Sequence, residues 1–218
     1  MANNLNDLFK KELFKRIISV IFFVPLVLLP IFLNNYSVLF IYLLFNALIL
    51  AELIHMKSNR MSAILINIYA LITIFSFFAF IFLFINKSYT NILLVEFILT
   101  IWLFDTFSYL GGKLIGGVKL MPSISAGKTI SGLIIGTLVT IIVMQLYKYL
   151  IYDFQLIYLF QSICIIALSF LGDVTASVIK RISQVKDSGN IMPGHGGLFD
   201  RFDSFIAVFC FFGLIKLF

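Results

Sequence analysis

The chain has 218 residues, of which 61% are hydrophobic and only 12% charged, and its mean hydropathy is +1.09. A composition this apolar excludes an ordinary soluble fold and indicates one integral membrane domain. The formal net charge of +6 comes from basic residues scattered between apolar runs, which favours a role in membrane topology over a patch that binds nucleic acid.

The first 16 residues, MANNLNDLFKKELFKR, are polar and amphipathic. The apolar run that follows is long and lacks a small-residue cleavage site. We therefore predict that residues 1–16 form a retained segment on the cytoplasmic membrane surface rather than a removed signal peptide. Residues 17–218 are predicted to form a single transmembrane catalytic domain.

Seven apolar runs come close to the roughly 20 residues that a helix needs to cross a bilayer. They cover residues 17–33, 37–54, 62–85, 91–111, 130–150, 155–176 and 203–218. The predicted fold class is therefore all-α: a multi-pass membrane protein with about seven transmembrane helices. The 26 Phe and nine Tyr residues are interpreted first as a lipid-facing surface.

The basic residues predict the orientation of these spans. If the runs alternate in direction, only Lys87, Lys148 and Lys216 of the 16 Lys and Arg residues fall on the second side. The positive-inside rule then places the N-terminus and the loops 112–129 and 177–203 in the cytoplasm, and the C-terminus outside.

Three acidic residues lie within the first four apolar runs. Asp105 lies deep in its span, where a carboxylate usually faces a polar cavity, and we expect it to belong to the functional site. Glu52 has His55 one turn further on, and pairing of these two side chains is the simplest interpretation. Glu96 lies near the outer end of its span and is expected to be interfacial.

The stretch 172–204, GDVTASVIKRISQVKDSGNIMPGHGGLFDRFDS, gathers most of the charge of the second half of the chain. If the preceding helix continues into it, Asp173, Ser177 and Lys180 share one face. The glycines around His195 would expose backbone N–H groups to an anion such as phosphate. Asp200 and Asp203, three residues apart, would turn two carboxylates the same way. Carboxylates, basic residues and a glycine-rich loop together favour Mg²⁺-dependent chemistry on phosphates.

These residues also resemble a known signature. The matching positions are Ser177, Lys180, Arg181, Lys186, Asp187, the run Pro193 to Gly197, and Asp200 to Asp203. In order and spacing they resemble the signature of the phosphatidate cytidylyltransferase family, whose members are also called CDP-diacylglycerol synthases. The resemblance implies transfer of the cytidylyl group of CTP to phosphatidate in a membrane, with release of pyrophosphate and with one or two Mg²⁺ ions.

A second element, DTFSYLGGKLIGGVKLMPSISAGKTISG at 105–132, is similar to two further family motifs. The matching residues are Asp105, Thr106, Tyr109, Gly111, Gly112, Ser125, Lys128, Thr129 and Gly132. Ala126, Gly127 and Ser131 depart from the family's Pro, Lys and Glu, and Ala176 stands where members often have Glu. These departures remove one positive and two negative charges near the expected site.

The resemblance implies roles for individual residues. Catalytic roles are implied for Asp173, Lys180, Arg181, Asp200 and Asp203, with Asp173, Asp200 and Asp203 as the metal ligands. Substrate-binding roles are implied for Asp105, Ser125, Lys128, Thr129, Ser177, Lys186, Asp187, His195, Gly196, Gly197 and Arg201. The expected partners are CTP and phosphatidate, without nucleic acid, and the expected location is a bacterial inner membrane; a homodimer stays open.

Other interpretations of single residues stay open. Asp173 can be a solvated carboxylate at a helix end, and Asp200 and Asp203 can favour a helix N-terminus through its dipole. Lys180 and Arg181 can anchor a helix at lipid headgroups, and Lys128 can serve membrane topology alone. His195 can bind phosphate, relay a proton or hold its loop.

Two other functions remain as alternatives. One is a CTP-dependent polyprenol or phytol kinase, which would transfer the γ-phosphate of CTP. The other is a transporter, which would spread charge through the membrane midplane instead of gathering it at one face. A CDP-alcohol transferase is excluded because its spaced Asp-Gly and Gly-x-x-x-Asp-x-x-x-Asp pattern is missing.

Overall fold

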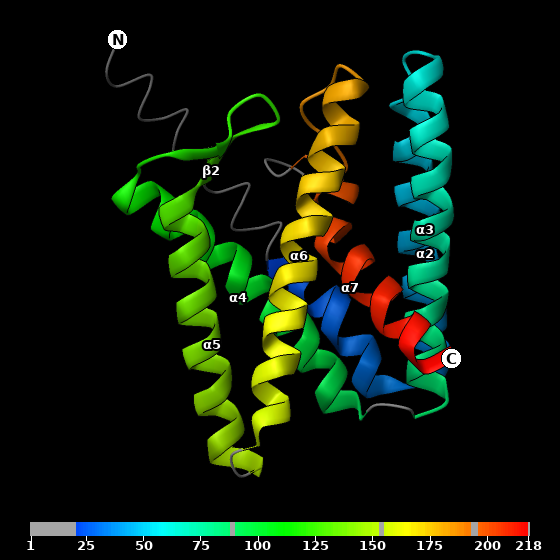
Figure 1. Cartoon of the computed structure of the whole chain (residues 1–218). Coiled ribbons are helices and arrows are strands. Elements are labelled where there is room, and N and C mark those ends of the chain that lie inside the picture. Colours follow the sequence, from blue (N-terminus) through cyan, green and yellow to red (C-terminus); the bar gives the residue numbers. More distant parts are fainter. Residues whose placement is uncertain (1–20, 88–89, 153–154, 193–195, 218) are drawn as a thin grey trace, which may run out of the picture.

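The computed structural model of the chain describes residues 21–87, 90–152, 155–192 and 196–217 (Figure 1). These residues form seven helices and one two-stranded sheet, which confirms the predicted all-α class. The helices are Ile21–Leu33, α2 (Asn35–His55), α3 (Arg60–Ile85), α4 (Asn91–Ile115), α5 (Ile130–Tyr152), α6 (Leu156–Ile182) and α7 (Phe199–Leu217). The segment predicted to lie on the membrane surface, 1–16, falls outside the described residues.

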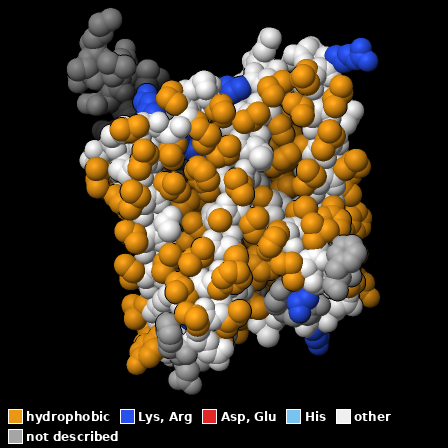
Figure 2. All heavy atoms as spheres, viewed as in Figure 1, with side chains coloured by type: hydrophobic (Ala, Val, Ile, Leu, Met, Phe, Trp, Pro, Cys, Tyr) orange, Lys and Arg blue, Asp and Glu red, His pale blue; other side chains and the backbone are white. Residues whose placement is uncertain are grey.

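Within the described residues, five helices, α2 to α6, are long and apolar enough to cross a membrane. The described part of the first helix, Ile21–Leu33, is shorter. Helix α7 carries Asp200, Arg201 and Asp203 near its start and is not among the five. Side chains on the face shown in Figure 2 are mostly hydrophobic, as expected for a surface in contact with lipid.

Polar side chains fix where several helices begin. Asn34 accepts a hydrogen bond from the Ser37 amide at 2.8 Å and caps α2. Asn59 and Ser62 form a reciprocal capping box at the start of α3. These caps satisfy N–H groups that the first helical turn leaves without a partner.

The connection between α4 and α5 forms an antiparallel β-hairpin of β1 (Lys119–Met121) and β2 (Ser125–Thr129). Figure 1 shows this hairpin at the same end of the molecule as the loop between α6 and α7. Residues 112–129 were expected to form only a loop, but the prediction that the two connections lie on one face is confirmed.

Aromatic side chains fill the core between α2, α3 and α7. The Tyr42 and Phe80 rings are stacked with centroids 4.3 Å apart, and Phe80 meets Phe209 edge-on at 4.9 Å. The Phe205 and Phe209 rings lie 4.4 Å apart. The prediction of a lipid-facing aromatic surface is therefore incomplete, because many of these rings pack against one another inside the bundle.

Glycines let α4 and α5, and likewise α6 and α7, pack at short distances. A Cβ atom on Gly136 of α5 would lie 1.9 Å from Oγ of Ser108 on α4. A Cβ atom on Gly172 of α6 would lie 2.6 Å from the carbonyl oxygen of Asp203 on α7. The second contact places the helix turns that carry Asp173 and Asp203 side by side.

Candidate active site

A cavity of about 370 Å³ opens at the end of the bundle that holds the hairpin. Its walls come from α4, the hairpin, the start of α5, α6, the loop after α6, and α7. The residues that line it are Phe104, Asp105, Ser108, Tyr109, Leu120, Ser125, Gly127, Lys128, Thr129, Gly132, Leu133, Phe170, Asp173, Lys180, Asp187, Asp200, Arg201 and Asp203. Elements far apart in the sequence thus contribute to one polar cavity.

Helix α6 continues to Ile182, so Asp173, Ser177 and Lys180 do share one helical face, as predicted. The Ser177 hydroxyl is buried and donates to Oδ1 of Asp173 at 3.4 Å. Asp173 and Lys180 line the cavity, whereas Ser177 is not among the lining residues. Ser177 therefore contacts the Asp173 carboxylate from the protein side.

Lys128, from strand β2, reaches across to α6. Its Nζ lies 2.7 Å from Oδ2 of Asp173, and it also lies over the Phe170 ring, 5.2 Å from the centroid. The neighbouring Thr129 hydroxyl accepts a hydrogen bond from the Gly132 amide at 3.1 Å. The hairpin thus presents a cation to the cavity next to the first turn of α5, while Thr129 supports that turn.

Asp200 is held from several directions. Its Oδ1 lies 2.5 Å from Nζ of Lys180, and its Oδ2 accepts the amides of Ser188 and Gly197 at 2.9 and 3.1 Å. Burial alone would raise the pKa of this carboxyl, but the Lys180 ammonium and the two amides outweigh it and hold the pKa below its usual value. Asp200 is therefore ionised at neutral pH, and it ties the loop after α6 to the start of α7.

Glu52 of α2 makes long-range contacts that its local sequence does not predict. Its Oε1 accepts the Leu198 amide at 2.9 Å, and its Oε2 accepts the Phe199 amide at 2.8 Å and the Ser188 hydroxyl at 3.0 Å. Glu52 is buried whereas His55 is exposed, so the expected pairing of these two side chains is wrong. The only sequence signal was an acidic residue inside an apolar helix.

These contacts also change the interpretation of the glycine-rich loop. The expectation was that its backbone N–H groups are open to an anion. Instead, the amides of Gly197, Leu198 and Phe199 all donate to carboxylates of the protein itself. Gly196 has a φ of +85°, which glycine adopts readily, and its carbonyl accepts the Met192 amide at 3.0 Å. His195 lies outside the described residues.

Two of the expected basic residues are placed away from the cavity lining. Arg181 donates through Nε to the Ile124 carbonyl at 2.9 Å and through a terminal nitrogen to the Val185 carbonyl at 3.1 Å. It thus joins α6 to the turn of the hairpin. Lys186 is exposed and is not among the lining residues, whereas the neighbouring Asp187 is.

The donor chemistry of the cavity suits a hard divalent cation. Asp105, Asp173 and Asp203 come from α4, α6 and α7, and the negative charges of Asp105 and Asp173 both act on the Asp203 carboxyl. A divalent cation would offset this repulsion, and oxygen ligands are those that Mg²⁺ prefers. Among the described residues no group of three such side chains stands at metal-binding distance, and Lys128 already pairs with Asp173. The chemistry of these residues fits the ion, but their side chains do not form a complete coordination shell.

Together the bundle and this cavity define a helical integral membrane protein with a charged, carboxylate-rich site at one end of its spans. Residues 7–218 match the family model described as "Cytidylyltransferase family". The chain therefore belongs to the cytidylyltransferase family, and the resemblance found in the sequence is confirmed.

Individual relatives agree with this placement. The chain is 37% identical over 214 residues to the phosphatidate cytidylyltransferase of Rickettsia typhi, an alignment that covers 94% of this chain and 92% of the relative. It is 33% identical over 223 residues to the enzyme of the same name from Rickettsia conorii, with 98% and 95% covered. Identity reaches 48% over 113 residues with the Staphylococcus haemolyticus enzyme, which covers 50% of this chain and 43% of that relative.

Proposed function

We propose that this membrane enzyme transfers the cytidylyl group of CTP to phosphatidate, giving CDP-diacylglycerol and pyrophosphate. The observation that carries the proposal is the cavity in which Lys128, Lys180 and Arg201 lie beside Asp105, Asp173 and Asp203 at one end of the spans. Such a site can hold a polyphosphate while a lipid phosphate approaches from the surrounding bilayer. Relatives that carry the name phosphatidate cytidylyltransferase over nearly the whole chain support the same reaction.

The cationic side chains bind the triphosphate. Lys128 turns from Asp173, and Lys180 turns from Asp200. Both then direct their ammonium groups to the phosphate oxygens. Arg201, also on the lining, adds a planar guanidinium suited to two phosphate oxygens. Because both substrates are anions, these charges reduce the repulsion between them.

Asp173 and Asp203 are proposed Mg²⁺ ligands, and Asp200, which also lines the cavity, completes the predicted set once Lys180 turns from it to the phosphates. Bound Mg²⁺ would neutralise charge on the triphosphate and on the leaving pyrophosphate. Asp105 lines the same cavity, and its charge acts on the neighbouring Asp203 carboxyl, so it limits where an anion can sit.

The reaction itself needs little from the protein beyond placement. A phosphatidate oxygen forms a bond to the α-phosphorus of CTP, and the bond from that phosphorus to the oxygen bridging to the β-phosphate breaks. Phosphatidate is already anionic and nucleophilic at neutral pH, so no general base is required. The enzyme contributes orientation and charge neutralisation.

We further propose that the cavity faces the cytoplasm of a bacterial cell, in the inner membrane, because CTP is a cytoplasmic nucleotide and the basic residues favour this side.

The alternative reaction, a polyprenol kinase, predicts a different fate for the labelled phosphate of CTP. Purified protein in phosphatidate-containing vesicles should transfer label to the lipid from α-labelled CTP but not from γ-labelled CTP. Transfer of the γ-label to an added polyprenol would instead establish the kinase reaction.

A further inference from the structure

We infer that Glu52 is a positioning residue for cytidylyl transfer, acting from α2 on the loop and helix that carry Asp200, Arg201 and Asp203. The inference rests on the proposed function. Glu52 is not on the lining of the cavity, and none of the family motifs matched in the sequence includes it.

The Glu52 carboxylate occupies the place where a helix N-terminus attracts an anion. Its two oxygens accept the amides of Leu198 and Phe199, immediately before and at the first residue of α7. The partial positive charge of the helix start therefore falls on a side chain of the protein rather than on substrate. Glu52 is only 5% exposed, so its carboxylate has little contact with water. The hydrogen bonds from the Leu198 and Phe199 amides take the place of hydrogen bonds to water.

The loop is shaped to fit around this carboxylate. A Cβ atom on Gly189 would lie 2.7 Å from Oε1 of Glu52, and one on Gly197 would lie 2.5 Å from Oε2. The backbone of this loop thus approaches the Glu52 carboxylate at two glycines, Gly189 and Gly197. A residue with a Cβ atom at either position would clash with the carboxylate. The glycines expected to open the loop to phosphate make room for Glu52 instead.

A short chain of contacts links Glu52 to the site. The Ser188 hydroxyl lies 3.0 Å from Oε2 of Glu52 and 3.1 Å from Oδ2 of Asp200, whose other oxygen holds Lys180. A shift of Glu52 therefore moves Ser188 and the start of α7, which position Asp200. Asp200 in turn positions the Lys180 ammonium in the cavity. Positioning partners of this kind commonly change activity by about 10- to 100-fold when they are removed.

The test compares Glu52→Gln with His55→Gln, a matched change one turn away at an exposed position of the same helix. Both full-length variants are purified in detergent, and the folded fraction is isolated before assay. Glu52→Gln is expected to lower kcat/KM for CTP by about 10-fold or more per folded molecule. It is also expected to speed amide hydrogen exchange in residues 196–204, whereas His55→Gln should match the wild type in both measurements.

A second variant covers the case in which Glu52→Gln fails to fold. Ser188→Ala leaves the cap on α7 and removes only the hydroxyl between the two carboxylates, so it is expected to lower kcat several-fold while exchange at residues 198 and 199 stays slow. Wild-type kcat and KM in Ser188→Ala, or in folded Glu52→Gln, would overturn the inference. Unchanged exchange at 196–204 in Glu52→Gln would overturn it as well. Absence of cytidylyl transfer in the wild type would count against the proposed function alone, because hydrogen exchange still tests the hold of Glu52.

Discussion

Nζ of Lys128 in the hairpin lies 2.7 Å from Oδ2 of Asp173 on α6, 45 positions further along the chain. This ion pair joins the two stretches that the sequence singles out, and both of its side chains line the cavity. It also means that a triphosphate arriving in the cavity competes with Asp173 for Lys128, while Mg²⁺ competes with Lys128 for Asp173. Binding of nucleotide and of metal are thus expected to favour each other.

Replacing Lys128 with Met should weaken CTP binding. The variant loses a charge-assisted contact to phosphate worth about 1.5–3 kcal/mol, so KM for CTP is expected to rise about 10-fold or more. Lys119→Met is the matched control, because Lys119 lies in the same hairpin but is exposed and outside the cavity lining. Equal KM values for the two variants would contradict the assignment of Lys128.

Replacing Asp173 with Asn should remove turnover and leave the fold intact. The side chain is 36% exposed and faces the cavity, so the loss of its charge costs little stability. We expect kcat to fall by a factor on the order of 100 or more, measured as lipid-bound label per folded enzyme. A rate near that of the wild type would remove Asp173 from the proposed metal site.

Asp200→Asn should differ from Asp173→Asn because it also costs stability. Asp200 accepts hydrogen bonds from Lys180, Ser188 and Gly197, and loss of its charge is expected to lower the free energy of unfolding by about 2 kcal/mol. The folded-state pKa of Asp200 lies below its unfolded value of about 3.9, so this stabilisation is complete above about pH 5. It is lost as the pH falls through the folded pKa. Denaturant titrations of both proteins from pH 7 to about pH 3 check this, and a stability difference that grows toward acid would contradict it.

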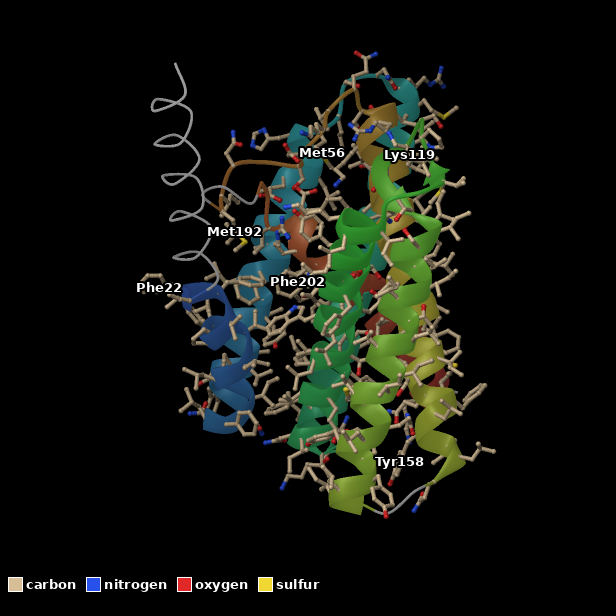
Figure 3. All side chains as sticks on the ribbon, turned by 90° about the vertical axis from the view of Figure 1, so that its left-hand side faces the viewer. Phe22, Met56, Lys119, Tyr158, Met192 and Phe202 are labelled. Atoms are coloured by element: carbon tan, nitrogen blue, oxygen red, sulfur yellow. The ribbon has the colours of Figure 1, made fainter. Side chains whose placement is uncertain are left out.

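A buried ion pair lies at the opposite end of the spans. Lys148 of α5 pairs with Glu96 of α4 and lies over the Tyr158 ring, 4.7 Å from its centroid; Figure 3 shows Tyr158 far from Lys119 of the hairpin. Glu96 is buried between helices near the start of α4, and its expected position at the membrane interface stays a prediction. Lys148→Met should destabilise the protein by about 3 kcal/mol because it strands a buried carboxylate.

The double variant Glu96→Gln with Lys148→Met should recover most of that loss, since no charge is then left buried alone. Turnover per folded molecule should stay at the wild-type value in both variants. If the stability losses of Lys148→Met and of Glu96→Gln alone simply add in the double variant, the two side chains are not coupled and the interpretation is wrong.

The close contact of α4 and α5 predicts a further effect on stability. Gly136→Ala places a Cβ atom 1.9 Å from Oγ and 2.9 Å from the backbone nitrogen of Ser108, so the helices must separate. We expect a loss of about 1–3 kcal/mol in unfolding free energy. Gly127→Ala is the control for stability, because its Cβ atom would meet nothing within 4 Å. A Gly136→Ala protein as stable as that control would contradict the packing.

Local periodicity explains what could be predicted from the sequence. The shared face of Asp173, Ser177 and Lys180 follows from helix geometry alone, and so does the placement of Asp200 and Asp203 three residues apart on α7. The apolar runs predict where α2 to α6 begin to within two residues, because length and hydropathy decide which segments cross a bilayer, whereas α6 ends at Ile182 rather than at 176. The roles of individual site residues and of Mg²⁺ stay predictions.

Long-range contacts explain what was missed. Glu52 and Leu198 are 146 positions apart, and nothing in the local pattern of either stretch points to the other. The hairpin was missed because Ser125, Gly127 and Lys128 are poor strand formers, so tertiary context decides their conformation. The inward packing of Phe205 and Phe209 was missed because an apolar ring suits lipid and a membrane core equally well.

Cytidylyl transfer at this cavity is tested most directly by measuring both products in one reaction. Wild-type protein in phosphatidate vesicles with CTP and Mg²⁺ should form CDP-diacylglycerol and pyrophosphate in equal amounts, quantified by mass spectrometry and by a pyrophosphate assay. EDTA and the Asp173→Asn change should each abolish both products. Release of CDP in place of pyrophosphate, or full activity in Asp173→Asn, would contradict cytidylyl transfer at this cavity.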